Sequence, residues 1–153
     1  MKIIFDRLSS GYIYPLSKKE IIQATNIVSS NDLEKIRIIR FGCNTKTTQE
    51  GRTVQHGNFY DIRINFFLKE FTSIILSDDK SYINHLKIFT NGVDQKTRII
   101  SWELAEAKRY ALFLLFHEIG HVIYSEHHSS MKMTSQTKNE EQWCDRYAMQ
   151  TVG

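Results

Sequence analysis

Two histidines and a glutamate within five residues offer the clearest chemistry in this chain. His117-Glu118-Ile119-Gly120-His121 spells H-E-x-x-H inside a strongly apolar stretch. On an α-helix, residues four apart project from nearly the same face, so both histidines can offer a ring nitrogen to one metal ion. Glu118 would lie beside a water on that ion and act as its general base. The pattern predicts a zinc hydrolase.

The apolar surroundings of the motif favour a metal site. Residues 111–116 read ALFLLF, which predicts a buried helix. Buried histidines cost several kcal/mol unless their polar atoms have partners, and a metal ion would be such a partner. A pair of core histidines satisfied by ordinary hydrogen bonds is the alternative.

A catalytic zinc ion usually has three protein ligands and one open position, so a third ligand is needed. Glu141 is the favoured residue, on a predicted helix that begins near Asn139. A place in the first turn of that helix would stabilise its carboxylate. Asp145 follows four residues later on the same helical face, where it could accept the outer N–H of a ligand histidine and fix that ring.

His127 is the competing third ligand. It lies ten residues after His117, which is the spacing of the extended H-E-x-x-H-x-x-G-x-x-H pattern. Tyr124 stands where that pattern has glycine, and a bulky residue is poor at the positive φ that would end the helix there. A helix continued to residue 127 would carry His127 about 15 Å from His117. Glu141 is therefore preferred.

The motif and the segment after it resemble a known group of enzymes. The spacing from His121 through nineteen residues to Glu141-x-x-x-Asp145 is similar to that of the gluzincin metallopeptidases. The closer resemblance is to the ImmA/IrrE-type metallopeptidases of bacteria, phages and mobile elements, in which E-x-x-A-[ND]-x-F-A follows the H-E-x-x-H helix. Residues 141–148, EQWCDRYA, match that segment with Cys for Ala and Tyr for Phe. The resemblance covers residues 109 to 148.

The resemblance implies roles for the matching residues. His117, His121 and Glu141 would be the ligands of one zinc ion per chain. Glu118 would be the general base, and Asp145 would orient a ligand histidine. The implied fold is α+β and zincin-like: a small, twisted, mostly antiparallel sheet packed on the H-E-x-x-H helix, with a C-terminal helix carrying the third ligand. The implied activity is hydrolysis of peptide bonds in a protein or peptide substrate.

The pattern of apolar residues predicts the elements that would position these groups. Ser17 and Glu20 form a capping box at the start of the first predicted helix. Helices are expected over residues 17–30, over 101–125 with Ser101 as cap, and from 139 onward. Strands are expected over 2–6, 35–41, 58–68, 83–90 and 97–100, the last two joined around residues 91–92. Loops are expected over 42–51 and 126–138. The strand over 58–68 is the candidate sheet edge along which a peptide would lie.

Length and composition predict one globular domain over residues 1–153. Hydrophobic residues make up 41% and charged residues 24% of the chain. Neither a secretory signal nor an apolar run of roughly 20 residues is present, so a cytoplasmic protein without membrane contact is expected. The net charge of +3 comes from scattered Lys and Arg, so nucleic acid is not an expected partner. Cys43 and Cys144 are too few for a disulfide framework and should be reduced.

Other polar and aromatic residues have lesser expected roles. A peptidase also needs a group that stabilises the oxyanion. The candidates are Tyr124, His127, His128 and Tyr147. Cys144 is expected to pack on the helix, and Trp102 and Trp143 are expected to be core anchors. Structural or surface roles are expected for His56 and His85. The alternative function is a zinc-stabilised protein of phage or mobile-element origin that keeps this fold but acts only by binding a partner.

Overall fold

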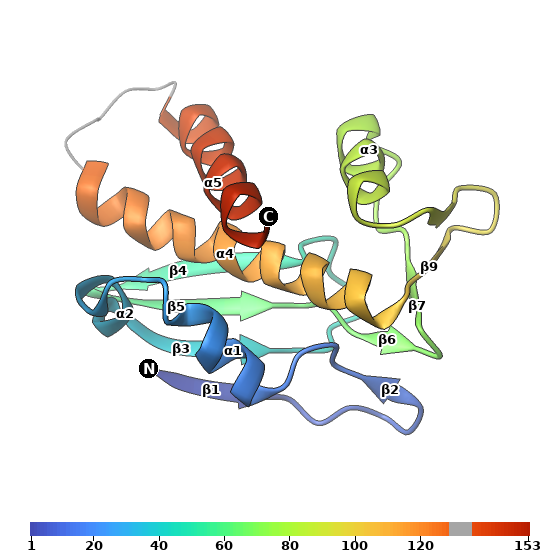
Figure 1. The fold of residues 1–153 in the computed structure, drawn as a ribbon, viewed down its shortest axis with the longest axis horizontal. Coiled ribbons are helices and arrows are strands. Elements are labelled where there is room, and N and C mark those ends of the chain that lie inside the picture. The colour runs from blue at the N-terminus through green and yellow to red at the C-terminus, as the bar shows by residue number, and fades with distance from the viewer. Residues whose placement is uncertain (129–135) are drawn as a thin grey trace.

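A computed structural model describes residues 1–128 and 136–153 of the chain (Figure 1). Its helices are α1 (Lys18–Thr25), α2 (Ser30–Lys35), α3 (Lys80–Phe89), α4 (Leu104–His128) and α5 (Gln136–Val152). Its strands are β1 (Lys2–Phe5), β2 (Tyr12–Ile13), β3 (Ile36–Phe41), β4 (Gly51–His56), β5 (Phe59–Ile64), β6 (Leu68–Lys69), β7 (Thr72–Ile74), β8 (Gly92–Asp94) and β9 (Ile99–Ser101). None of the described helices is long and apolar enough to cross a membrane.

A four-stranded sheet in the order β1-β3-β5-β4 supports the H-E-x-x-H helix. Strands β1, β3 and β5 run parallel, and β4 pairs antiparallel with β5 at one edge. The expectation of a mostly antiparallel sheet is wrong for this layer. Helices α1 and α2 carry the chain back between β1 and β3, and such a crossover makes neighbouring strands parallel.

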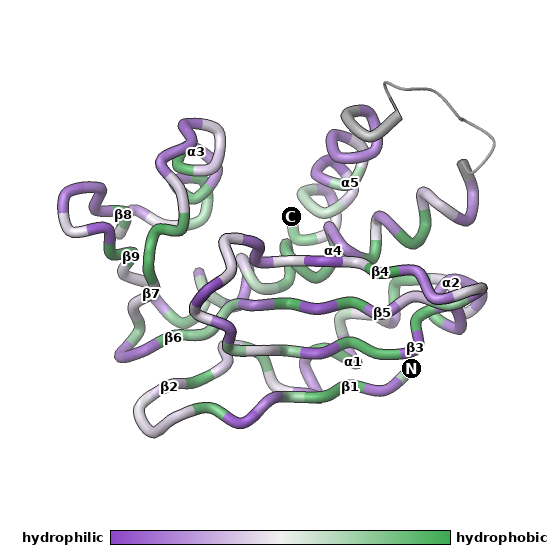
Figure 2. The backbone as a smooth tube through the Cα atoms, turned by 180° about the vertical axis from the view of Figure 1, so that it is seen from behind, coloured by the Kyte–Doolittle hydropathy of each residue, from purple (hydrophilic) through white to green (hydrophobic). Residues whose placement is uncertain are grey.

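The two faces of this sheet differ in what covers them. Helices α1 and α4 lie on one face (Figure 1), whereas none of the described helices covers the opposite face (Figure 2). Along β5, Tyr60, Ile62 and Ile64 are buried toward the helices, while Arg63 is exposed on the open face. Successive side chains of a strand point to opposite faces, so the alternation predicted for residues 58–68 is confirmed in β5.

A second, five-stranded sheet in the order β2-β6-β7-β9-β8 is antiparallel throughout. It lies beyond one end of α4 (Figure 1). A hairpin joins β8 to β9 in this sheet. The turn predicted around residues 91–92 is therefore wrong, because β8 begins at Gly92. Trp102 follows β9, is buried, and donates a 2.8 Å hydrogen bond to Ser73, which confirms it as a core anchor.

The strand predicted over residues 83–90 is wrong, because these residues belong to α3. The Asp79 carboxylate caps that helix by accepting two backbone N–H groups of its first turn, at 2.7 and 3.3 Å. Ile83, Leu86 and Phe89 are buried at intervals of three residues, which is a helical period. The apolar residues were therefore recognised, but with the wrong period.

Strand β4 was not predicted, because residues 51–56 lack a clean alternation of polar and apolar residues. It forms the edge of the sheet that lies against α4. Strand β5, the predicted edge, lies between β3 and β4 instead. Any peptide aligned along this edge would therefore contact β4.

Helix α4 begins and ends later than predicted. Ser101 is the last residue of β9 and does not cap the helix. The first turn is held instead by the Glu106 carboxylate, which accepts the backbone N–H of Glu103 at 2.9 Å. Because α4 reaches His128 and α5 starts at Gln136, both ends of the predicted 126–138 loop are helical. The rest of that segment, 129–135, lies outside the described residues.

Helix α5 packs closely on α4 at a glycine. A Cβ atom on Gly120 would lie 3.3 Å from the Cα atom of Cys144 and 3.2 Å from its Sγ atom. Cys144 is buried, so its predicted packing role is confirmed. The absence of a side chain at residue 120 lets the two helices approach, and this approach brings Glu141 toward the histidines.

We predict that Gly120→Leu lowers the free energy of unfolding by about 1–3 kcal/mol, because the added side chain would overpack the α4–α5 contact. Denaturant unfolding measures the change. Ala105→Leu adds the same side chain at an exposed position of α4 and should change that energy by less than about 0.5 kcal/mol. Equal stability of the two variants would contradict close packing at Gly120.

Candidate metal centre

His117, His121 and Glu141 converge on one point between α4 and α5. The Nε2 atom of His117 lies 3.0 Å from Glu141 Oε2, and the Nε2 atom of His121 lies 3.0 Å from Glu141 Oε1. The ligand atoms all lie within 4.8 Å of one another, and no other group of this kind occurs in the described part of the chain. These three residues can therefore hold a metal ion, as the sequence predicted.

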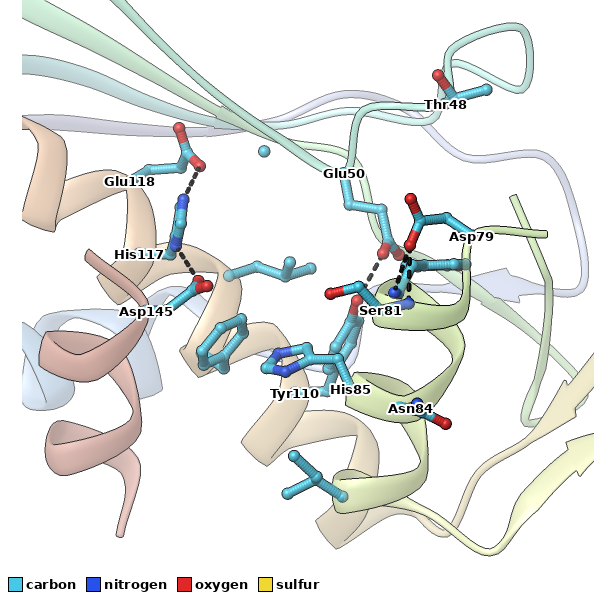
Figure 3. A pocket seen from close by; sticks show the side chains of 15 residues that line it. Thr48, Glu50, Asp79, Ser81, Asn84, His85, Tyr110, His117, Glu118 and Asp145 are labelled. Carbon is cyan, nitrogen blue, oxygen red and sulfur yellow. Dashed lines mark hydrogen bonds and ion pairs between the residues drawn. The ribbon is translucent and has the colours of Figure 1, made fainter. Parts of the chain in front are cut away.

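Carboxylates also hold the outer nitrogens of both histidine rings. Asp145 Oδ1 lies 2.8 Å from His117 Nδ1 (Figure 3), a close contact that does not have the geometry of a hydrogen bond. Glu140 Oε2 lies 2.6 Å from His121 Nδ1. A proton held at Nδ1 leaves Nε2 as the ligand atom. Asp145 thus lies beside the outer nitrogen of His117, as predicted, without the predicted hydrogen bond. Glu140 contacts the outer nitrogen of His121, and sequence reasoning missed it.

The charges of this cluster are strongly coupled. Burial alone would lower the histidine pKa values, but Asp145 and Glu141 raise the pKa of His117 to about 9. Burial also acts to lower the pKa of His121, but contacts with Cys144, Glu141 and Glu140 raise it to about 11. Hydrogen bonds from the two histidines hold the pKa of Glu141 well below its usual range. A divalent cation would therefore replace protons on the two rings.

Glu118 is buried next to the triad and is held by strand β4. The Thr53 hydroxyl lies 2.9 Å from Glu118 Oε1 and 3.1 Å from the backbone carbonyl of Glu118. Gly51 lies against the same carboxylate, since a Cβ there would be only 2.6 Å from Glu118 Oε2. That oxygen lies 3.9 Å from His117 Nε2, and burial raises the pKa of Glu118. The carboxylate thus lies close to the ligand nitrogens without being one of the three converging ligands.

His127 is not part of this centre. Helix α4 continues through residue 127, and His127 Nε2 lies 3.0 Å from Asp32 Oδ1 of α2. Glu141 is the sixth residue of α5 and lies beyond its first turn, so the predicted stabilisation of its carboxylate by the helix N-terminus does not apply. The contacts with His117 and His121 stabilise its carboxylate instead.

Three of the four oxyanion candidates line neither of the two cavities beside Glu118. They are Tyr124, His127 and Tyr147. The side chain of the fourth, His128, lies outside the described structure. Tyr124 and Tyr147 pack with Trp143. Burial raises the pKa of the Cys144 thiol, which agrees with a packing role.

Cavities flank Glu118 on both sides. One, of about 520 Å³, extends past His121 toward Gln55 and Tyr60 on the sheet. The other, of about 680 Å³, extends along α4 toward α3 (Figure 3). Both are lined by Gly51, so the start of β4 runs past the centre from one cavity to the other. His85, expected to be structural or on the surface, lines the larger cavity.

A second carboxylate lies at the far end of the larger cavity. Glu50 immediately precedes β4, and its Oε1 atom accepts a 2.6 Å hydrogen bond from the Tyr110 hydroxyl. Burial raises the pKa of Glu50 to about 7, and the hydrogen bond offsets only part of that rise. No feature of the sequence marked this residue, because residues 42–51 read as a polar loop.

Comparisons of the chain with models of protein families, with curated proteins and with solved structures found no significant match. The case for a metal centre therefore rests on the geometry of this chain.

We predict one metal ion per chain in protein purified without a metal-binding tag, measured by mass spectrometry. Glu141→Ala should abolish binding because it removes one of three ligands, whereas His127→Ala should bind like the wild type. Asp145→Asn should weaken the affinity about 10- to 100-fold, because it loosens the His117 ring. Loss of the ion in His127→Ala, or retention in Glu141→Ala, would contradict this site.

We also predict a pH-dependent stability that depends on Glu50. Its pKa in the folded state, about 7, exceeds the ordinary 4.5, so the folded chain binds the extra proton between these values. The contribution of Glu50 to the free energy of unfolding is fully present below about pH 4.5 and is lost as the pH rises through 7. Tyr110 and Tyr82, which face Glu50, stay neutral over this range because burial raises their pKa values.

The variant Glu50→Gln should therefore gain stability relative to the wild type between pH 5 and 8, by up to about 3 kcal/mol. Denaturant unfolding with a metal chelator present measures the difference at each pH. Glu34→Gln removes an exposed carboxylate from α2 and should show no such trend. If the difference in the free energy of unfolding between Glu50→Gln and the wild type did not change with pH, this carboxyl group would be solvated.

Proposed function

We propose that this protein is a zinc-dependent metallopeptidase of the gluzincin type, with His117, His121 and Glu141 as zinc ligands and Glu118 as general base. The observation that carries the proposal is the placement of Glu118. A buried carboxylate, fixed by Thr53, lies 3.9 Å from a ligand nitrogen of the only metal-binding group found in the described residues. A metal site that served stability alone would not need such a group beside it.

The donor set supports zinc as the metal. Two imidazole nitrogens and one carboxylate are typical of catalytic zinc sites that keep a fourth position open. Ligand atoms of a tetrahedral zinc ion lie about 3.3 Å apart, given bonds of about 2.0–2.1 Å. The distances of 3.0 Å from Glu141 to each histidine are close to this value. The side chain of Glu141 is about half exposed, 52%, so the centre is open to solvent on that side.

A bound zinc ion would supply an acidified water and would polarise the carbonyl group of the substrate. The chain's own residues would handle the protons. Glu118 takes a proton from the attacking water at a carboxylate oxygen and later delivers it to the leaving amine. The raised pKa of Glu118 suits both steps, because the protonated form is less costly in a buried site. Thr53 keeps the carboxylate in one orientation throughout.

The sheet edge supports a peptide substrate. Strand β4 pairs with β5 on one side only, so its other side has unpaired backbone N–H and C=O groups. An extended peptide can add to such an edge as a further strand. Cavities on both sides of Glu118 would receive side chains on either side of the bond that is cut. A small-molecule substrate would need neither the edge nor the second cavity.

We predict that Glu118→Gln reduces peptide hydrolysis by about 100- to 10,000-fold while the protein still binds zinc and folds normally. Cleavage of a mixed peptide library, followed by mass spectrometry, measures activity, and metal analysis and circular dichroism provide the two controls. Glu34→Gln should retain full activity.

Two outcomes would contradict the proposal. Cleavage by Glu118→Gln at the wild-type rate would exclude the assigned base. A zinc-loaded wild type that cleaves no peptide would favour the alternative function, in which the metal stabilises a protein that acts by binding a partner.

A further inference from the structure

The larger cavity beside the metal centre connects Glu118 at one end with Glu50 at the other (Figure 3). Along its length lies one face of α4, with His117 and Tyr110 seven residues apart. At 1.5 Å per residue, this separation is about 10 Å along the helix. Glu50 contacts the Tyr110 hydroxyl, so its carboxylate lies at the Tyr110 end of this face and away from the His117 end.

The α4 side of the cavity is apolar between the two ends, where Phe113 and Leu114 lie. The α3 side is mixed, with the polar residues Ser81, Asn84 and His85 as well as Ile88. The apolar side suits the aliphatic part of a long side chain, which buries its methylene groups and keeps its polar tip beyond them. A short side chain would leave the far end of the cavity empty.

None of the described residues lining the cavity supplies a cation to Glu50. Tyr110 is its hydrogen-bond partner, and no Lys or Arg is among the described residues that line the cavity. His85 adds no positive charge there, because burial lowers its pKa. A partly buried carboxylate with a single neutral partner is costly to ionise, and an incoming positive charge would offset that cost.

A second metal ion does not explain the arrangement. Asp79 and Asp145 also line the cavity, which makes it acidic overall. In the described residues, however, the ligand atoms close enough to share an ion are those of His117, His121 and Glu141. The acidic end therefore suits an organic cation better than a coordinated ion.

We propose that this cavity binds a lysine or arginine side chain of the substrate, next to the bond that is cut, and that the Glu50 carboxylate pairs with its charged tip. This inference rests on the proposed peptidase function and names the substrate class: peptides with a basic residue beside the cleavage site. Glu50 is a specificity-determining residue here and takes no part in the proton transfers assigned to Glu118.

A mixed peptide library with mass-spectrometric detection of the cut sites tests the inference. The zinc-loaded wild type should prefer Lys or Arg over norleucine at one position beside the cut. Glu50→Gln should reduce that preference about tenfold or more, because it removes one partner of a partly buried charge pair. The same variant should cleave the norleucine peptides within about twofold of the wild type. Glu50→Asp, which keeps the charge, should retain part of the preference, and Glu34→Gln should retain all of it.

A binding experiment separates this inference from the proposed function. Zinc-loaded Glu118→Gln protein is titrated with Nα-acetyl-lysine methylamide, Nα-acetyl-arginine methylamide and the norleucine analogue, with detection by NMR. Binding of the cationic probes that is lost when Glu50→Gln is added supports the cavity assignment even if no peptide is cleaved. Cleavage without a basic preference, or equal binding of all three probes, overturns the assignment and leaves the peptidase proposal intact.

Discussion

The Glu141 carboxylate of α5 contacts two histidines of α4, and the rest of the site depends on these contacts. One oxygen faces His117 Nε2 and the other faces His121 Nε2, each at 3.0 Å. The contact requires α5 to lie against α4 within the distance that Gly120 allows. The same register brings Glu140 and Asp145 to the outer nitrogens of the rings. The position of one helix on another thus sets the ligands and the groups that orient them.

The strand at the sheet edge supplies the other half of the site. Thr53 and Gly51 of β4 fix the Glu118 carboxylate, and Glu50 reaches the cavity from the residue just before the strand. Residues 50, 51 and 53 of the chain therefore contact the Glu118 carboxylate or line the larger cavity beside it. The charged groups of the centre each lie within 3.0 Å of an oppositely charged neighbour. A divalent cation in the centre would neutralise part of the remaining negative charge.

The sequence predicted the parts of the site that lie on helices, because helical spacing is local. The four-residue spacings of His117 and His121, and of Glu141 and Asp145, determine which side chains share a face. The choice of Glu141 over His127 followed from the same geometry. Glu140, Thr53, Gly51 and Glu50 were missed because their roles depend on how α5 and β4 meet α4, which no local spacing encodes.

The errors in the fold have similar causes. The segment that forms α3 was predicted as a strand because its buried residues fit two periods over a short run, and the Asp79 cap that decides between them was not recognised. Strand β4 has few apolar residues, since one of its sides is open and Gly51 must leave room for Glu118. The parallel pairing of β1, β3 and β5 arises from crossover connections between segments far apart in the chain.

The most direct test of the metal centre is a crystal structure of the zinc-loaded protein with anomalous data collected on both sides of the zinc absorption edge. The account predicts a single strong anomalous peak about 2.0–2.2 Å from His117 Nε2, His121 Nε2 and a Glu141 oxygen, with Glu118 adjacent but not bound to it. A peak elsewhere, or ligation by His127 in place of Glu141, would contradict it.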